Sequence, residues 1–192
     1  RVTKIFEKYF INRARRTVFV TKKASVDAKV RYKSLEKKIT FFYPGARHFN
    51  LLSSHKDDKA QAQKRNPIEL LHMGTLYGNR NLDNFFYALD ELYVEEKVQP
   101  GFIKITNLGS VYCKGRDKYL AREDFLLLTE VNRFDAIKRA SSANALLLVQ
   151  HCDPRSLETI PYKVYDYLNL GLLIFGLINS SELENLLNSS KR

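Results

Sequence analysis

Cysteine, long apolar runs and metal-binding spacings are scarce in this sequence. The 192 residues include two cysteines, Cys113 and Cys152, which are too few for a disulfide scaffold, so we expect reduced thiols in the cytoplasm. No apolar run reaches the roughly 18 residues that a membrane-spanning helix requires, and the sequence therefore predicts none. The four histidines show no ligand spacing and the cysteines form no Cys-x-x-Cys pair, so no metal site is expected.

Several familiar catalytic signatures are missing as well. The chain contains neither a Gly-x-Gly-x-x-Gly fingerprint nor a P-loop, and no nucleophile elbow supports Ser-His-Asp chemistry. The first residue is Arg1, and no signal segment follows it. From this start we expect the chain to be an internal piece of a longer protein.

Positive charge is abundant but unevenly distributed. The chain carries 32 Lys and Arg against 21 Asp and Glu, a formal charge of +11. Residues 1–66 hold 18 of the basic and 5 of the acidic residues, a net charge of +13, which leaves −2 for the remainder. Such a basic region can meet nucleic acid, anionic lipid or a phosphorylated ligand, or it can be a solvated face, and net charge does not choose among these.

Apolar periodicity predicts an alternation of helices and strands. Helices are expected over 2–14, 24–35, 81–96, 117–122, around 134–140, over 161–169 and from Ser180 through Leu187, and strands over 17–21, 39–43, 68–73, 102–106, 125–128, 145–149 and 172–175. The first helix is basic and amphipathic, and its apolar stripe could pack on a sheet or lie on a membrane, of which packing is favoured.

The alternation also predicts the fold class. Strands that alternate with helices indicate βαβ units, and near-continuous apolar strands indicate a parallel sheet covered on both faces. We therefore expect an α/β fold with a Rossmann-like parallel sheet. Residues 53–67 are polar with almost nothing to bury, which predicts a linker between residues 1–52 and a domain at 68–192.

The loop after the strand at 68–73 could bind a phosphate. Gly74 and Gly78 would let the backbone approach an anion closely, and the following helix would offer its N-terminal N–H groups. Arg80 is unfavourable at a helix start, where it meets the positive end of the helix dipole, but it could reach a diphosphate with two hydrogen bonds. From the glycines alone, a flexible turn with a surface arginine is the simpler interpretation.

A second segment, residues 160–171, carries a lysine and a carboxylate on one helical face. Lys163 and Asp166 are three residues apart, so they point the same way. They could hold a phosphate and sugar hydroxyls respectively. The alternative is a surface ion pair, which is common and contributes little to stability.

Together these segments resemble a known family. From about Ile68 to Leu187 the chain resembles the donor-binding domain of GT-B retaining glycosyltransferases, the group 1 or family 4 type. The first motif is a strand ending in Gly-Thr-Leu-Tyr, residues 74–77, with Arg80 behind it. The second is residues 160–171, similar to the family's Pro-x-Lys-x-x-Glu-Tyr stretch, which ends in glycine before an apolar strand. Residues 1–52 then look like the trailing part of the acceptor domain, and the resemblance implies truncation at both ends.

The resemblance also implies residue roles. Gly74, Thr75 and Arg80 would hold the donor diphosphate together with Lys163, and Asp166 would contact the ribose. Glu158 stands at the family's spacing before Asp166 and would lie near the donor sugar. The residues with implied catalytic roles are Arg80, Lys163 and Glu158. The segment 129–133, which includes Thr129 and Val131, is similar to the region that borders the nucleotide base.

The function implied is transfer of a sugar from a nucleotide diphosphate sugar to an acceptor hydroxyl, with retention, in polysaccharide or lipid-linked glycan synthesis. No cofactor and no metal would be needed, because basic side chains would supply the positive charge. The expected partners are the nucleotide-sugar donor and a glycan or lipid-linked acceptor bound by the missing domain, with peripheral contact at the inner membrane face and no nucleic acid. The alternative is a non-catalytic Rossmann-like nucleotide-binding module or a basic interaction module.

Overall fold

The computed structural model describes residues 2–45, 67–129 and 131–190, which form two units. The first unit contains residues 2–45, 153–162 and 179–190, and the second contains 67–129, 131–152 and 163–178. The two later segments of the first unit lie within the range predicted for the donor domain. Of the predicted linker at 53–67, residues 53–66 lie outside the described residues.

The first unit is built around a pair of short parallel strands. Its elements are α1 (Val2–Arg13), β1 (Thr17–Phe19), α2 (Lys22–Arg31), the 3-10 helix η1 (Lys33–Lys38), β2 (Ile39–Phe41), the 3-10 helix η3 (Pro154–Leu157) and α8 (Ser181–Ser189). Strands β1 and β2 pair in parallel. A small core of Ile11, Ala28, Tyr32 and Ile39 joins α1, α2 and β2. Glu182 of α8 accepts hydrogen bonds from the N–H groups of Lys22 and Lys23, which fastens α8 to the start of α2.

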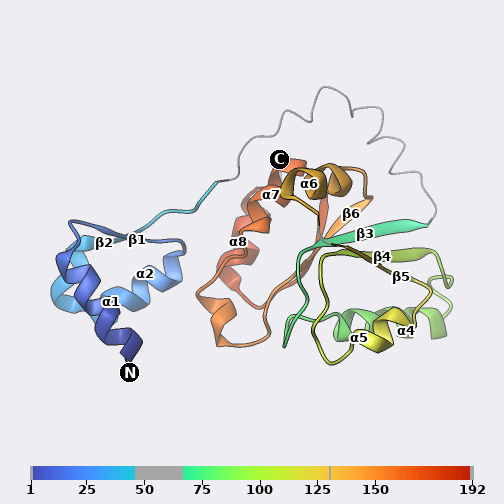
Figure 1. Ribbon diagram of the computed structural model, residues 1–192, viewed down its shortest axis with the longest axis horizontal. Helices are drawn as coiled ribbons and strands as arrows, with labels where there is room; N and C mark the ends of the chain where they lie inside the picture. Colours follow the sequence, from blue (N-terminus) through green and yellow to red (C-terminus); the bar gives the residue numbers. More distant parts are fainter. Residues whose placement is uncertain (1, 46–66, 130, 191–192) are drawn as a thin grey trace. The chain divides into compact units, whose positions relative to one another are not determined.

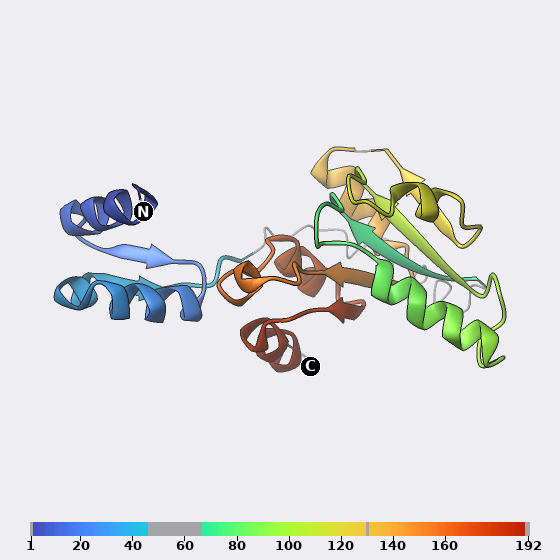
Figure 2. The same cartoon turned by 90° about the horizontal axis from the view of Figure 1, so that it is seen from below.

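The second unit is a five-stranded parallel sheet. Its elements are β3 (Ile68–Met73), α4 (Asp83–Val94), β4 (Ile103–Leu108), α5 (Arg116–Leu120), β5 (Phe125–Leu128), α6 (Arg133–Ser141), β6 (Ala145–Val149), α7 (Lys163–Leu170) and β7 (Leu173–Leu177). The strand order is β5-β4-β3-β6-β7, and every neighbouring pair is parallel. Figure 1 shows α4 and α5 on one face of the sheet and α6 and α7 on the other, and the turned view in Figure 2 shows its twist. This confirms the predicted α/β, Rossmann-like class.

The order of the strands reverses between β3 and β6. From β3 the chain moves outward through β4 to β5 and then returns to place β6 on the other side of β3. In open parallel sheets, ligands bind at such a reversal, beyond the carboxyl ends of the strands. The pairing of the strands is also shorter there: β3 pairs with β4 over six residues but with β6 over only two.

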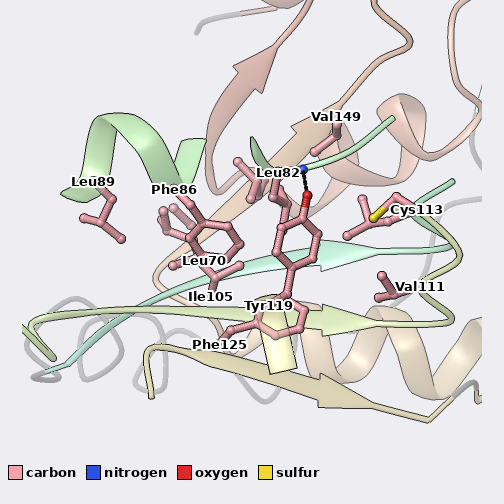
Figure 3. Packing of buried hydrophobic residues seen from close by; sticks show 13 residues of the cluster. Leu70, Leu82, Phe86, Leu89, Ile105, Val111, Cys113, Tyr119, Phe125 and Val149 are labelled. Carbon is pink, nitrogen blue, oxygen red and sulfur yellow. Dashed lines mark hydrogen bonds between the residues drawn. The ribbon is translucent and has the colours of Figure 1, made fainter. Parts of the chain in front are cut away.

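The core of the second unit explains the apolar strands. Figure 3 shows Phe86 of α4 and Tyr119 of α5 packed with Phe125 of β5 over the central strands. The Tyr119 hydroxyl accepts a hydrogen bond from the backbone N–H of Leu82 and donates one to the Asp83 carboxylate. This one side chain therefore fills the core and holds the start of α4 in place.

Most predicted elements are confirmed, and the differences lie at their ends. The predicted helix over 24–35 is α2 followed by the separate 3-10 helix η1. The predicted helix over 161–169 begins at Lys163, so Pro161 precedes the helix and is not its first residue. The predicted helix from Ser180 through Leu187 is α8, and Ser180 caps it by accepting a hydrogen bond from the N–H of Leu183. None of the helices within 2–45, 67–129 and 131–190 has the length and apolar character needed to span a membrane.

Candidate functional site

A tyrosine separates the two central strands where the sheet order reverses. Tyr167 of α7 accepts a hydrogen bond from the backbone N–H of Met73 and donates one to the carbonyl of Leu147. These two backbone groups belong to β3 and β6, and the phenol bridges them past the last paired residues. The side chain is fully buried, so it holds the two strands together at the carboxyl end of the sheet.

Two glycines bring the loops after β3 and β4 together at the carboxyl end of the sheet. A Cβ atom on Gly109 would lie 2.8 Å from the carbonyl carbon of Gly74, which is closer than real contacts allow. Gly109 also has a φ of +132°, a conformation that side chains rarely adopt. The loops then run side by side, since Leu76 and Val111 form a parallel bridge. The Gly74 N–H donates to the Leu108 carbonyl, so Gly74 contributes space to the site and not a donor.

Lys163 occupies the space that Gly74 leaves. Its Nζ atom would be 3.2 Å from a Cβ atom at position 74, so any side chain there would compete with the lysine. The same Nζ atom lies 2.8 Å from Nε2 of His72, the penultimate residue of β3. Burial, followed by the nearby positive charge of Arg80, lowers the pKa of Lys163 to about 7.

His72 is neutral and its ring has a defined orientation. It is fully buried, and burial together with the charge of Lys163 holds its pKa well below the usual range. Its Nδ1 atom lies 2.6 Å from Oδ1 of Asn107, and the Asn107 amide nitrogen donates to the carbonyl of Gly109 at 2.7 Å. Because an amide oxygen only accepts, Nδ1 of His72 carries the proton and Nε2 presents a lone pair to Lys163.

Arg80 is the second cation at this edge of the sheet. Its guanidinium carbon lies 5.3 Å from the ring centre of Tyr77, and its Nε atom is buried without a hydrogen-bond partner among the described residues. The Tyr77 hydroxyl lies 3.2 Å from Nε2 of His151, which follows β6. The loop after β3 is thereby tied to the loop after β6. Within the described ranges, neither Arg80 nor Lys163 forms an ion pair with a carboxylate.

Asp166 is buried and already holds an arginine. Its Oδ1 atom lies 2.6 Å from Nη2 of Arg133, and its Oδ2 atom lies 3.3 Å from Nε of the same residue. Arg133 is the first residue of α6 and is half-exposed, so the pair links α6 with α7. The two carboxylate oxygens keep further lone pairs with which they can accept hydrogen bonds from a ligand.

The other predicted site residues are placed as follows. Thr75 follows Gly74 in the loop after β3 and is half-buried. Thr129 follows β5 and is exposed, as is Val131 just before α6. Glu158 belongs to the first unit, where it is exposed after η3 and its carbonyl accepts a hydrogen bond from the hydroxyl of Thr21. The structure therefore gathers Gly74, Arg80 and Lys163 in the second unit, where Asp166 lies on the same helix as Lys163.

Sequence reasoning overlooked three polar residues of this site: His72, Asn107 and His151. We considered the histidines only as metal ligands, and the part of the chain described here contains no group of three or more His, Cys, Asp or Glu side chains able to hold a metal ion. A usable signal was nevertheless present. Each residue stands at or just beyond the carboxyl end of an apolar strand, where burial of a polar side chain indicates a role at the ligand-binding edge.

Comparison with known proteins adds no assignment. No protein-family model matches the chain, and none of the curated proteins is detectably similar to it in sequence.

Proposed function

We propose that the second unit binds a nucleotide diphosphate sugar and that the protein of which it is a part transfers the sugar to an acceptor hydroxyl. The observation that carries the proposal is the pair of cations, Arg80 and Lys163, which have no carboxylate partner in the described structure and share the reversal point of the sheet with Gly74. Two basic side chains that have no carboxylate partner among the described residues suit a ligand with two negative charges.

The other features of the site fit the two ends of such a ligand. A diphosphate beside Lys163 and Arg80 would carry its nucleoside toward Asp166, whose carboxylate can accept hydrogen bonds from ribose hydroxyls. Thr129 and Val131 follow β5 and would border the base. In this proposal Thr75 lines the diphosphate loop, whereas the role of Glu158, which belongs to the first unit, stays a prediction from the resemblance.

The chemistry proposed is a glycosyl transfer. The bond between the anomeric carbon and the diphosphate oxygen breaks, a new bond forms to the acceptor oxygen, and the acceptor hydroxyl loses its proton. Negative charge develops on the departing diphosphate, and Arg80 and Lys163 would stabilise it there. Cations fixed in advance where charge develops are among the strongest contributions to catalysis.

The proposal extends to the acceptor and its location. The acceptor would be a glycan or a lipid-linked sugar held outside the second unit, and the reaction would take place at the cytoplasmic face of the inner membrane. Support comes from the basic residues and from α1, whose Ile5, Phe6 and Phe10 are exposed beside Lys4 and Lys8.

The test is calorimetric titration of the full chain with UDP-glucose, GDP-mannose and ADP-glucose. One of the three is expected to bind, and Arg80→Ala and Asp166→Ala are each expected to weaken binding at least tenfold. A charge-assisted hydrogen bond contributes about 1.5–3 kcal/mol, and 1.4 kcal/mol corresponds to a tenfold change in affinity. If no nucleotide sugar binds, or if both variants bind like the wild type, the proposal is wrong.

Matched controls come from α5, on which Arg116 and Asp117 form an exposed pair. Arg116→Ala and Asp117→Ala are expected to leave the affinity unchanged. Because the acceptor would be bound by the missing domain, the chain alone is expected to show little or no turnover, and nucleotide-sugar binding is the deciding measurement. If instead binding were due to the basic region alone, affinity would fall steeply with salt and would not depend on Asp166.

A further inference from the structure

Three polar side chains form a hydrogen-bonded chain behind the proposed diphosphate site. The chain runs from the carbonyl of Gly109 through the amide of Asn107 and the ring of His72 to the Nζ atom of Lys163. His72 and Asn107 are fully buried, and Lys163 is the member that lies against Gly74. The chain thus connects a buried backbone group to the cation expected to meet the ligand.

The geometry allows only one arrangement of protons in the buried part of this chain. Asn107 donates to Gly109 and must accept from His72, so Nδ1 of His72 is protonated and Nε2 is a lone pair. That lone pair can only accept from Lys163. A second proton on His72 would place two positive donors 2.8 Å apart with no anion between them. Any proton gained or lost here therefore belongs to Lys163.

Among the residues that the structure describes, the charged groups around Lys163 do not compensate an ammonium charge. From β3 it faces neutral His72, from β4 the uncharged Asn107 lies behind that ring, and from the loop after β3 it faces cationic Arg80. On its own helix the nearest carboxylate in sequence, Asp166, is engaged by Arg133 of α6. An empty site thus disfavours the charged lysine, and a diphosphate reverses this balance by supplying negative charge.

We propose that the Asn107–His72–Lys163 chain makes ligand binding proton-linked: Lys163 takes up one proton from solvent as a diphosphate enters, and His72 positions the resulting ammonium group against it. The inference rests on the proposed function and goes beyond it, because it assigns His72 and Asn107 as positioning residues. The step is a simple protonation, in which the neutral amine of Lys163 and a proton from the buffer give the ammonium ion.

Calorimetry in buffers of different ionisation enthalpy measures this proton directly. The ligands are UDP-glucose, GDP-mannose and ADP-glucose, whose diphosphates are diesters and do not titrate near neutral pH. With the pKa of Lys163 at about 7, the full chain is expected to take up most of one proton per ligand at pH 8 and much less at pH 6. Tight binding without proton uptake at pH 8 overturns the inference and leaves the proposed function intact.

Two variants of the site sharpen the result. Lys163→Met removes the titrating group and is expected to abolish the uptake. Arg80→Ala removes the neighbouring positive charge, so Lys163 should be more fully protonated before binding and the uptake at pH 8 should fall. An unchanged uptake in Lys163→Met shows that the proton goes elsewhere and contradicts the inference.

The role of His72 is tested by a pair of substitutions. His72→Phe removes the acceptor for Lys163, so affinity should fall about tenfold more at pH 8 than at pH 6. His72→Gln can present an amide oxygen to Lys163 and should recover most of the affinity at pH 8. A purely structural role would weaken binding equally at both pH values and would not distinguish Gln from Phe.

A measurement without ligand keeps the inference testable if no nucleotide sugar binds. In ¹⁵N-histidine spectra of the full chain, one histidine should stay neutral, with its proton on Nδ1, below the pH at which an ordinary histidine titrates, and its signals should be missing in His72→Gln. If that histidine carries its proton on Nε2 or titrates near its ordinary pKa, the proton arrangement inferred for the Asn107–His72–Lys163 chain is wrong. If the histidine behaves as expected but no sugar nucleotide binds, the proposed function has failed instead.

Discussion

The two edges of the parallel sheet differ in whether their charged side chains have partners of opposite charge. At the amino edge, the carboxylates of Glu69 and Asp124 are each paired with an arginine. At the carboxyl edge, the described structure leaves Lys163 and Arg80 without a carboxylate, next to a buried neutral histidine. Paired charges in a part-buried place stabilise a fold, whereas unpaired ones cost stability and persist where they serve a ligand. The contrast separates the structural edge from the functional one.

Charged side chains at the amino edge form several hydrogen bonds each. Glu69 of β3 pairs with Arg139 of α6 and also accepts from the hydroxyl of Thr106. On the other face, Arg122 contacts both Asp124 and Asp90, with its guanidinium carbon 4.3 Å from the ring centre of Phe86. These pairs join helices to strands on both sides of the sheet.

The largest effect is expected from Arg122→Met. The change leaves the buried carboxylate of Asp124 without its arginine and removes the contact with Phe86. Breaking one partner of a buried ion pair costs about 3–5 kcal/mol, so urea unfolding should show a loss of this size with nucleotide-sugar affinity unchanged. Arg116→Met, on the exposed surface of α5, should change stability very little. A loss below about 1 kcal/mol for Arg122→Met would remove the basis for treating this edge as structural.

At the carboxyl edge, Gly109→Ala should be the most destabilising addition of a single methyl group. The new Cβ atom would lie 2.8 Å from the backbone of Gly74 in a backbone conformation with φ of +132°. We expect a loss of about 2–3 kcal/mol in urea unfolding, together with weaker ligand binding because the two loops separate. Gly78→Ala is the matched control: its φ is also positive but its Cβ would meet nothing within 4 Å, so about 1 kcal/mol is expected. Equal losses for the two glycines would mean that the loop contact is unimportant.

The pH dependence of stability should also distinguish the two edges. The pKa of Lys163 is about 7 in the folded protein and higher when unfolded, so the unfolded chain binds more protons between these values and stability rises with pH. Between pH 7 and pH 9 the gain should be about 2 kcal/mol, and it should be absent in Lys163→Met. At the amino edge, Arg122 lowers the pKa of Asp90, so that contribution is present at neutral pH and is lost only as the pH falls below about 4. Thermal or urea unfolding across pH 4–9 checks both windows, and a flat profile above pH 7 contradicts the first.

The smallest expected effect is a gain in stability from a single substitution. Lys163→Met at pH 7 should stabilise the ligand-free protein by about 1 kcal/mol, because a part-buried cation without an anion is replaced by an apolar side chain of similar length. The same variant should lose ligand affinity. Removal of charge would then destabilise one edge of the sheet and stabilise the other. A destabilised Lys163→Met would show that the lysine supports the fold as well.

The sequence was sufficient for the fold class because the strands of the second unit are continuous apolar runs separated by helical periodicity. β3 was predicted over its observed residues, and the strand at Ala145–Val149 is buried throughout. The ends of α2 and α7 were misjudged, since a helix and a following 3-10 turn share one periodicity and Pro161 suits several positions before a helix. Two segments of the first unit could not be foreseen, because long-range pairing such as that of Glu182 with the start of α2 leaves no local pattern.

The candidate site was predictable only in part. Arg80 and Lys163 were identified by residue type and position, and the structure brings both to one edge of the second unit. His72 was considered only as a metal ligand, for which the histidines lack the spacing, whereas its partners Asn107 and Lys163 come from two other elements. A buried polar group is recognised by what it contacts, and those contacts depend on the strand order.

The path of the chain through the two units limits how the protein can be dissected. The first unit takes residues 153–162 and 179–190 from the same stretch of sequence that supplies β6, α7 and β7 to the second. A single proteolytic cut therefore cannot release either unit intact, and a gene fragment that starts at β3 would encode η3 and α8 without the partners that Thr21 and Lys22 provide. The two units are interleaved in the gene although each has its own core, and domain exchange by simple recombination would have to move them together.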